Sequence, residues 1–294
     1  MTLETARLLE GAVDTHVHSA PDLVERKLDD FAVAQQARAA GMAGLVLKNH
    51  FFPTALRARL VAAQVPGVAV IGSIVLNQSM GGMNPWAVEA AARAGAKVVW
   101  LPTAHAAHQL RREAAAGGRP HPAALVLPGH ETAVHVFEPG NGHLTAAAEA
   151  VLEIVRDRHL VLATGHLSPD EVEQLTARAI DIGCRRIVAT HPDHALIAMP
   201  VALQHRLADR GVFFERTFNV TRPPYVVLSP DALAARIREV GPSSTILATD
   251  FGQPINPTPA EGMQQYVEAL ATNGFSADEI RTMASRNARA LLDL

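Results

Sequence analysis

Eight short apolar runs with strand-forming composition alternate with amphipathic, Ala-rich segments along this chain of 294 residues. The expected strands are Ala12–His18, Gly44–Lys48, Val68–Leu76, Lys97–Leu101, Leu160–His166, Arg186–His191, Val212–Arg216 and Thr245–Asp250. The helical segments between them include Asp29–Ala40, Pro85–Ala94, Ala146–Arg158, Pro169–Ile182 and Pro230–Val240. Eight strand–helix units favour an α/β fold of the (β/α)8 TIM-barrel type over an open doubly wound sheet. No G-x-G-x-x-G motif follows the first run, which counts against a dinucleotide-binding fold.

One connection is much longer than the others. The expected strand ends at 101 and 166 are about 65 residues apart, against 25 to 34 elsewhere. We therefore predict an insertion over Thr103–His143, which is rich in Pro and Gly and holds two apolar stretches, Ala124–Leu127 and Ala133–Phe137, that could pair as a hairpin. Because it follows the carboxyl end of a strand, it lies on the face where barrel enzymes keep their sites, and we interpret it as a lid. The alternative role is an oligomer contact, and we expect a homo-oligomer.

The composition is that of one domain, residues 1–294, in a cytoplasmic protein. The chain is 48% hydrophobic with a formal net charge of -3, which argues against a polyanionic partner. Its single cysteine, Cys184, excludes an internal disulfide framework and fits a reducing compartment. The N-terminal residues lack the features of a signal peptide, and no apolar run approaches the ~18 residues that span a bilayer. We expect no membrane partner.

The segment Asp14-Thr15-His16-Val17-His18 places two histidines two residues apart at the end of the first expected strand. Strand side chains alternate between two faces, so His16 and His18 point to the same side and can reach one metal ion together. Asp14 shares that face one step deeper, where its carboxylate could orient a ligating imidazole. A His-x-His pair alone is weak evidence, and it gains weight from the ends of the later strands.

Polar residues recur where those later strands end. They are Lys48 and His50 on the second strand, His166 on the fifth, His191 and His194 around the sixth, Glu215 and Arg216 on the seventh, and Asp250 on the eighth. In a parallel barrel these ends converge around one mouth. Imidazoles with one carboxylate suit zinc, iron(II), manganese or nickel rather than calcium or magnesium.

These residues, taken in order, resemble the amidohydrolase superfamily of metal-dependent TIM-barrel hydrolases. The likeness lies in the His-x-His pair, then His166, His191 and Asp250, and in the Asn287-containing last helical segment. The chain is similar to a branch of that superfamily without settled function. The resemblance covers nearly the whole chain and adds to the barrel pattern derived from the alternation of segments.

The resemblance implies that His16, His18, His166 and Asp250 hold a catalytic metal. His191 would bind a second metal or contact the substrate. Zinc is the preferred ion, with manganese, iron and nickel as alternatives, in a site of one or two ions. Water bound to such an ion has a pKa of about 7, and Asp250 would accept its proton and pass it to the leaving group.

Lys48 marks a departure from the superfamily pattern. Two-metal members usually carry a bridging carboxylated lysine or a glutamate on strand 4, whereas Lys97 stands at the beginning of that strand here. Lys48 is the only lysine at a strand end. It could bridge two metals if carboxylated, stay cationic and contact the substrate in catalysis, or pair with Asp14 or Glu215.

Leu47-Lys48-Asn49-His50 also resembles the strand-2 motif of the polymerase-and-histidinol-phosphatase family, a group of phosphoesterases. That family uses its strand-2 histidine as a metal ligand and a glutamate from strand 3. This chain has Asn49 for the usual aspartate and no glutamate on the third strand. His50 would decide between a metal ligand of that kind and a substrate-binding residue.

The expected substrate is a small molecule with an anionic group. Arg216 and Arg222, after the seventh strand, could clasp a carboxylate or phosphate, although a surface ion pair is an equal alternative. Among the histidines of the insertion, His105 is the one expected to face the site. With only 4% aromatic residues, no stacking platform for nucleic-acid bases is expected.

Three classes of function remain open from the sequence. The preferred one is a hydrolase that uses a metal-activated water to cleave a C–N or C–O bond of an amide, cyclic imide or lactone. The second is a metal-dependent decarboxylase, because related barrels run such chemistry with similar ligands. The third is a metal-binding or scaffold barrel without activity, which the intact set of histidines and Asp250 disfavours.

Overall fold

The computed structural model describes residues 8–118, 121–140, 142–224 and 226–294. The described residues form eight parallel strands in the order β1 to β8. Their bounds are Val13–Val17 (β1), Gly44–Leu47 (β2), Ala69–Val75 (β3), Ala96–Trp100 (β4), Val161–Ala163 (β5), Ile187–Thr190 (β6), Phe213–Thr217 (β7) and Thr245–Ala248 (β8). Each predicted run overlaps one strand, and the predicted (β/α)8 fold is confirmed.

The ring of strands closes between β8 and β1. Val17 and Phe251 form an isolated parallel bridge, and the backbone N–H of His18 donates to the Phe251 carbonyl at 2.8 Å. One step deeper, the backbone N–H of Asp250 donates to the His16 carbonyl at 2.9 Å. Closure of the barrel therefore sets the first strand's histidines beside the aspartate of the last strand, although 234 residues separate His16 from Asp250 (250 − 16).

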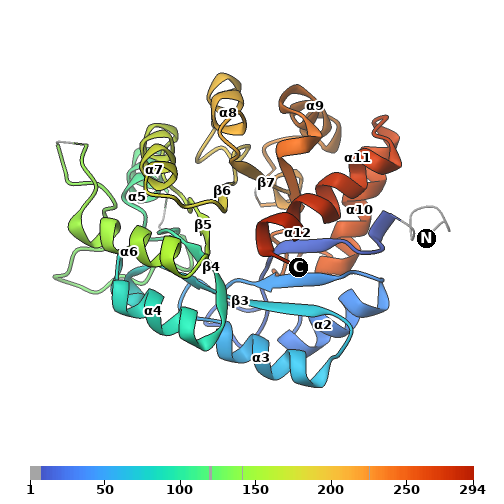
Figure 1. The fold of residues 1–294 in the computed structure, drawn as a ribbon, viewed down its shortest axis with the longest axis horizontal. Coiled ribbons are helices and arrows are strands. Elements are labelled where there is room, and N and C mark those ends of the chain that lie inside the picture. The colour runs from blue at the N-terminus through green and yellow to red at the C-terminus, as the bar shows by residue number, and fades with distance from the viewer. Residues whose placement is uncertain (1–7, 119–120, 141, 225) are drawn as a thin grey trace.

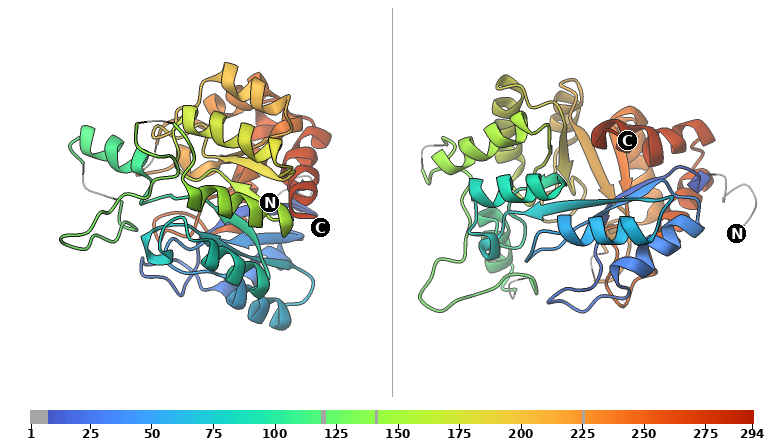
Figure 2. Two further views of the ribbon diagram at one scale, coloured as in Figure 1. Left: turned by 60° about the vertical axis from the view of Figure 1, so that its left-hand side comes forward. Right: turned by 60° about the horizontal axis from the view of Figure 1, so that its bottom comes forward.

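Helices surround the sheet on its outer side (Figures 1 and 2). They are α2 (Asp30–Ala39), α3 (Ala55–Gln64), α4 (Pro85–Ala94), α5 (Ala107–Ala115), α6 (Ala146–Asp157), α7 (Pro169–Asp181), α8 (Val201–Ala208), α9 (Pro230–Val240), α10 (Pro259–Thr272), α11 (Ala277–Arg281) and α12 (Asn287–Leu292). Short 3-10 turns lie at Gln78–Met80, Phe218–Thr221 and Pro242–Ser244, and a π turn at Thr282–Arg286. Capping explains where several begin: Ser168 and Glu171 form a reciprocal capping box ahead of α7.

The core has an inner and an outer part. Inside the barrel, alternate strand residues such as Val46, Val98 and Val188 pack with one another, and Leu291 of α12 packs against this group. Outside, the other strand face packs against the helices. The Asn287 side chain donates to the Thr245 carbonyl at 2.7 Å, which fixes the last helix to the beginning of β8. The carboxyl ends of the strands are thus left for a site.

The insertion after β4 differs from the sequence prediction. It contains the helix α5, and the predicted hairpin between 124–127 and 133–137 is not formed by these described residues. Val134 instead pairs with Ala106 at the barrel rim, and Phe137 pairs with Leu144. The side chains of residues 125–127 are 42–65% exposed. The prediction was wrong because the second stretch bonds to the rim of the barrel rather than to the first stretch.

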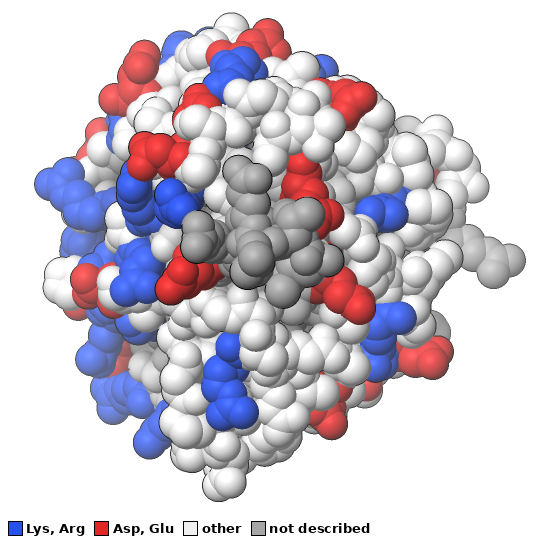
Figure 3. Space-filling model, turned by 90° about the vertical axis from the view of Figure 1, so that its right-hand side faces the viewer, with Lys and Arg blue, Asp and Glu red and all other residues white. Residues whose placement is uncertain are grey.

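The charged side chains of the described residues are mixed in sign on the face shown in Figure 3. Lys and Arg gather toward one edge of that face, with Asp and Glu among them, and the remainder carries both signs. Among the helices of the described residues, none has the length and apolar character needed to cross a membrane.

Candidate metal centre

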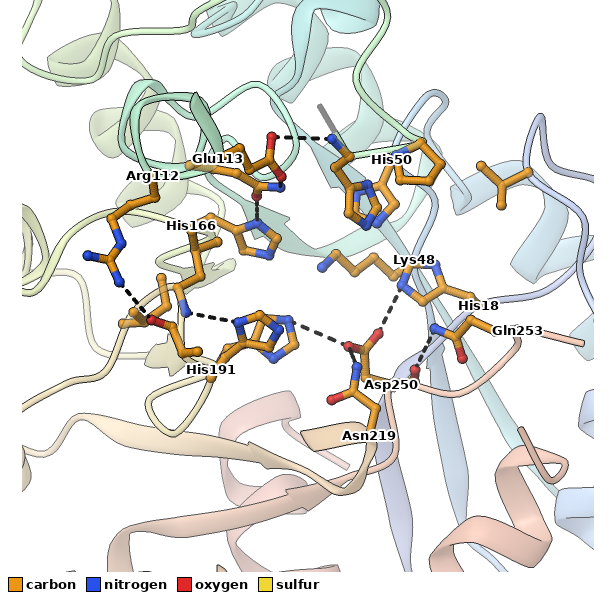
Figure 4. A pocket seen from close by; sticks show the side chains of 18 of the residues that line it. His18, Lys48, His50, Arg112, Glu113, His166, His191, Asn219, Asp250 and Gln253 are labelled. Atoms are coloured by element: carbon orange, nitrogen blue, oxygen red, sulfur yellow. Dashed lines mark hydrogen bonds and ion pairs between the residues drawn. The ribbon is translucent and has the colours of Figure 1, made fainter. Parts of the chain in front are cut away.

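A cavity of about 330 Å³ opens at the carboxyl ends of the strands (Figure 4). The strand ends contribute His18, Lys48, His166, His191 and Asp250 to its wall. His16 is fully buried and lies against two of these groups. The barrel therefore brings together all the residues that the sequence analysis proposed as metal ligands.

Three ligand atoms meet at one point of this site: His16 Nε2, His18 Nε2 and Asp250 Oδ1. His16 Nε2 lies 3.3 Å from His18 Nε2 and 3.0 Å from Asp250 Oδ1. His18 Nε2 lies 3.1 Å from the same oxygen. Tetrahedral zinc, with bonds of about 2.0–2.1 Å, holds its nitrogen ligands about 3.3–3.4 Å apart. The three distances between His16 Nε2, His18 Nε2 and Asp250 Oδ1 form a triangle. Its sides are close to the ligand–ligand distances on one face of a tetrahedral zinc site.

The protonation states of these three residues suit metal binding. Burial holds the pKa of His18 well below the usual histidine range, so its imidazole is neutral. Burial acts to raise the pKa of Asp250, but the neighbouring imidazoles of His16, His18 and His191 hold it well below the usual carboxyl range. Burial alone would lower the pKa of His16, whereas Asp250 and Glu215 raise it above its ordinary value. The carboxylates of Asp250 and Glu215 thus favour a positive charge, from a proton or a metal ion, next to His16.

Glu215, rather than Asp14, orients the His16 imidazole. His16 Nδ1 lies 2.9 Å from Glu215 Oε2. Because a carboxylate only accepts, Nδ1 carries the proton, and in the neutral ring Nε2 turns a lone pair toward Asp250. Asp14 instead accepts from the backbone N–H of His16 at 3.1 Å and from the hydroxyl of Thr249 at 2.5 Å. The expectation that Asp14 orients an imidazole was wrong, because its carboxylate is used by backbone and hydroxyl donors.

A chain of hydrogen bonds fixes His191. The Thr217 hydroxyl donates to Asn219 Oδ1 at 3.0 Å, and the Asn219 amide donates to Asp250 Oδ2. The threonine oxygen therefore accepts from His191 Nδ1, 3.1 Å away, and His191 Nε2 carries no proton in the neutral ring. This nitrogen lies 3.7 Å from Asp250 Oδ2. Two electron-pair donors face one another there, an arrangement that a cation stabilises.

His166 lines the same cavity but lies outside the two clusters of close ligand atoms, of which the second joins His16, His191 and Glu215. Its ring centroid is 5.3 Å from that of His191, and its Nδ1 pairs with Gln109 Oε1. Its Nε2 is buried without a hydrogen-bond partner among the described residues. Burial lowers the pKa of His166 well below the usual range, so its ring is neutral and one of its two nitrogens holds a lone pair. The residues present therefore fit a divalent transition metal.

The backbone at the site is strained at two of these residues. His191 and Asp250 have φ angles of 52° and 54°, in the left-handed region that side chains other than Gly rarely adopt. Such strain concentrates at functional sites, where the surrounding structure holds it. Two glycines support the arrangement: a Cβ on Gly165 would lie 2.4 Å from the Leu101 carbonyl oxygen, and one on Gly252 would lie 2.0 Å from the His18 carbonyl oxygen.

Gly252→Ala is therefore expected to lower the free energy of unfolding by about 3–5 kcal/mol, from the strain at its φ of 144° and the clash with the backbone of His18. Denaturant unfolding would measure it. Gly117→Ala is the control, because Gly117 also has a positive φ but has no atom near the added Cβ. The control should lose only about 1–2 kcal/mol. Equal losses in the two variants would contradict the close packing at Gly252.

Lys48 reaches into the cavity from the end of β2 (Figure 4). Its Nζ lies 5.2 Å from the centroid of the Trp100 ring. Burial lowers the pKa of Lys48 to about 8, against the opposing influence of Asp250 and Glu215. Within the part of the chain that the structure describes, the amine forms no ion pair with Asp14 or Glu215. The described residues therefore do not form the ion pair with Asp14 or Glu215 that was the third interpretation of Lys48.

The two substrate-binding histidines proposed from sequence have different surroundings. His50 lines the cavity, where its ring stacks on His18 with centroids 5.0 Å apart and its Nδ1 pairs with Thr103 Oγ1 at 2.9 Å. His105 is buried at the beginning of the insertion, and its Nε2 pairs with the carbonyl of Leu125, farther along the same segment, at 3.0 Å. His105 does not line the cavity, so the expectation that it faces the site is corrected: it holds the insertion in place.

The two arginines proposed to bind an anion form contacts with other residues outside the cavity. Arg216 is fully buried, with its guanidinium donating to Asp193 at 2.6 Å and to Gln204 at 2.7 Å. Arg222 donates to Gln265, and its guanidinium stacks over the ring of Phe218. Neither side chain lines the cavity, so their predicted placement is corrected. Arg216 is neither a substrate clasp nor a surface pair, but half of a buried ion pair.

Sequence reasoning missed several residues that line the cavity. Arg26 comes from the loop after β1, where its Nε donates to Asp22 at 2.7 Å. Asn219 was passed over beside its charged neighbours, although it contacts Asp250 directly. Four polar residues of the insertion also line the wall: Gln109, Arg112, Glu113 and His121. The insertion thus lies on the face of the metal cluster, as a lid requires, and its closure over a substrate stays a prediction.

Comparison with known proteins places the chain by family and by fold. Residues 11–215 match the "Family of unknown function (DUF6282)". No curated protein matches the chain. Among solved structures it is similar to the probable dipeptidase PvdM from Pseudomonas aeruginosa, with 12% identity, a TM-score of 0.65, and coverage of 98% of this chain and 96% of that one.

Two further solved structures of differently named proteins share this fold. An amidohydrolase from Pseudomonas aeruginosa has 10% identity, a TM-score of 0.63 and coverage of 99% and 98%. The 2,6-dihydroxybenzoate decarboxylase from Rhizobium has 11% identity, a TM-score of 0.53 and coverage of 97% and 99%. At these identities the likeness is one of fold alone, and it agrees with the (β/α)8 barrel predicted from the sequence.

Proposed function

The chain belongs to the DUF6282 family of unknown function, and on that premise we propose that it is a metal-dependent hydrolase. It cleaves a C–N or C–O bond of a small substrate that carries an anionic group. The observation that carries the proposal is the triangle of His16 Nε2, His18 Nε2 and Asp250 Oδ1, with sides of 3.0–3.3 Å, at a cavity of about 330 Å³. A cytoplasmic, homo-oligomeric enzyme remains part of the proposal.

A divalent transition metal, with zinc preferred, would supply Lewis-acid activation of water and of the substrate carbonyl. His16, His18 and Asp250 would hold it, with the Nε2 atoms of His166 and His191 available beside them. The two oxygens of Asp250 then have separate tasks. Oδ1 faces the histidines, whereas Oδ2 is held by the Asn219 amide. We assign Oδ2 to receive a proton from water and return it to the leaving nitrogen or oxygen.

The anionic group of the substrate is inferred from two buried cations with unused donors. Lys48 is 1% exposed and the Arg26 side chain 4% exposed, and both line the cavity. The Arg26 guanidinium is fixed through its Nε by Asp22, and within the described residues its Nη atoms and Lys48 Nζ have no hydrogen-bond acceptor. Buried cations need such partners, and a carboxylate of the substrate would provide them.

Part of the cavity lining is apolar. It includes Val24, Pro122 and Leu196–Ile197. A small apolar group next to the carboxylate would be sheltered there from water. N-acyl amino acids, cyclic imides and lactones with a free carboxylate are therefore the compounds to assay first. The phosphoesterase alternative is less well supported, because His50 pairs with Thr103 and belongs to neither cluster of ligand atoms.

Purified protein is expected to contain about one transition metal per chain, and His18→Ala to lose most of it. Elemental analysis after metal-supplemented expression measures both. Less than about 0.2 metal per chain, with no rebinding after supplementation, would contradict the metal site. With the metal established, release of carbon dioxide without water consumption would identify the decarboxylase alternative instead of hydrolysis.

A further inference from the structure

We infer that the helix α5 of the insertion sets the tautomer of His166 through Gln109 and Glu113, and so prepares His166 Nε2 to bind the metal. The inference rests on the proposed metal site and adds a pair of positioning residues to it. Neither residue belongs to the strand ends. Both come from the segment between β4 and α6, which the barrel itself does not need.

The contacts form a chain that begins at a carboxylate. Glu113 accepts from the Gln109 side-chain amide at 2.6 Å and from the backbone N–H of His121 at 3.2 Å. The amide oxygen of Gln109 then faces His166 Nδ1. Gln109 is 2% exposed and His166 9% exposed, so little water reaches this pair. All three residues line the cavity, and Figure 4 shows Glu113 and His166 among its side chains.

The chemistry of these groups allows one assignment of protons. Glu113 as a carboxylate can only accept, so the NH2 group of Gln109 must point to it and the amide oxygen must point to His166. That oxygen is also only an acceptor, so His166 Nδ1 carries the proton. The opposite orientation of the amide would set two acceptors 2.6 Å apart. His166 Nε2, which has no partner among the described residues, is therefore left with a lone pair at the cavity.

The same helix is fastened across the mouth of the barrel. His108 pairs through Nε2 with the Leu196 carbonyl at 3.0 Å, and Arg112 donates to the Ala195 carbonyl at 3.3 Å. These contacts join α5 to the loop that follows β6. When α5 docks in this position, Gln109 also contacts His166 Nδ1. The same docking therefore leaves the lone pair of His166 on Nε2, facing the cavity. Partners that fix a ligating histidine typically change metal affinity 10–100-fold when removed.

The test is Gln109→Leu, with Gln264→Leu as its matched control. Gln264 also donates to a glutamate four residues on in its helix, Glu268, at 3.1 Å, but it lies on α10 and does not line the cavity. We expect Gln109→Leu to weaken zinc binding 10–100-fold in a competition titration with a chelator, and Gln264→Leu to leave it unchanged. Equal affinity of Gln109→Leu and the wild-type protein would overturn the inference.

A second readout does not depend on metal or on activity. In metal-free protein labelled with ¹⁵N-histidine, with His166 assigned by His166→Gln, we expect the Nδ1–H tautomer in the wild type and in Gln264→Leu. Gln109→Leu should shift His166 toward the Nε2–H form. A wild-type His166 that carries its proton on Nε2 would overturn the inference even if the protein binds metal. The Nδ1–H form in a protein that binds no metal would support the positioning pair and refute the proposed function alone.

Discussion

Replacement of Asp250 by asparagine is expected to lower kcat by about 10²-fold or more while most of the bound metal remains. The single amide oxygen of asparagine can take the position of Oδ1 and still coordinate a metal, but an amide cannot take a proton from water. The carboxylate is suited to that task because it is ionised and because its Oδ2 is held toward His191. Steady-state kinetics on the first substrate identified, together with metal content per chain, would measure both effects.

Glu215→Gln provides the contrasting variant. Glu215 contacts His16 Nδ1 but does not line the cavity, so its replacement should weaken metal binding and leave kcat of the fully loaded enzyme close to normal. The two carboxylates are thereby separated into a proton acceptor and an orienting residue. Near-normal kcat in metal-loaded Asp250→Asn would assign proton transfer to another group.

The fold could be predicted from the sequence because the pattern of the chain and the topology agree. Each strand of a parallel barrel is buried on both sides, so it appears as an apolar run, and several helices begin behind a capping side chain such as Ser168 or Ser229. Residues at the carboxyl ends of such runs must converge, whatever lies between them. That is why His16, His18, His166, His191 and Asp250 could be grouped without knowledge of any contact.

The wrong prediction that Arg216 lies at the site has a geometric cause. Glu215 and Arg216 are adjacent, and side chains of a barrel strand alternate between the interior and the surrounding helices. Glu215 points inward to His16, so Arg216 must point outward, where it meets Gln204 of α8. Phe214, two residues before Arg216, packs in the outer core as well. Attention to this alternation would have excluded Arg216 from the site.

The contribution of the insertion could not be predicted in the same way. Its helix α5 bears Gln109 and Glu113, which carry no ligand motif and lie 57 and 53 residues from His166 (166 − 109 and 166 − 113). His121, one of many histidines in the segment, lines the cavity, whereas His105 does not. Only the docking of the insertion on the barrel rim determines which of them faces inward.

Replacement of Lys48 by methionine is expected to weaken binding of short carboxylic acids to the metal-loaded protein by about 10²-fold. Removal of a buried charge that pairs with an anion costs about 3 kcal/mol, or about 10²-fold in affinity. Lys48→Arg should keep a large part of that affinity, because its charge is retained. Calorimetric titration with short mono- and dicarboxylic acids measures the effect without a known substrate.

The pH dependence of binding and the metal content decide between a cationic and a carboxylated Lys48. With a pKa of about 8, the amine is mostly protonated at pH 7 and loses its charge as the pH rises, so affinity for a carboxylate should fall above pH 8. The pH profile of Lys48→Arg should be flat over that range, because a guanidinium stays charged. A cationic Lys48 also predicts about one metal per chain in both proteins. A carbamate on Lys48 instead predicts two metals, the second lost in Lys48→Ala and partly restored by short carboxylic acids, and that result would refute the cationic role.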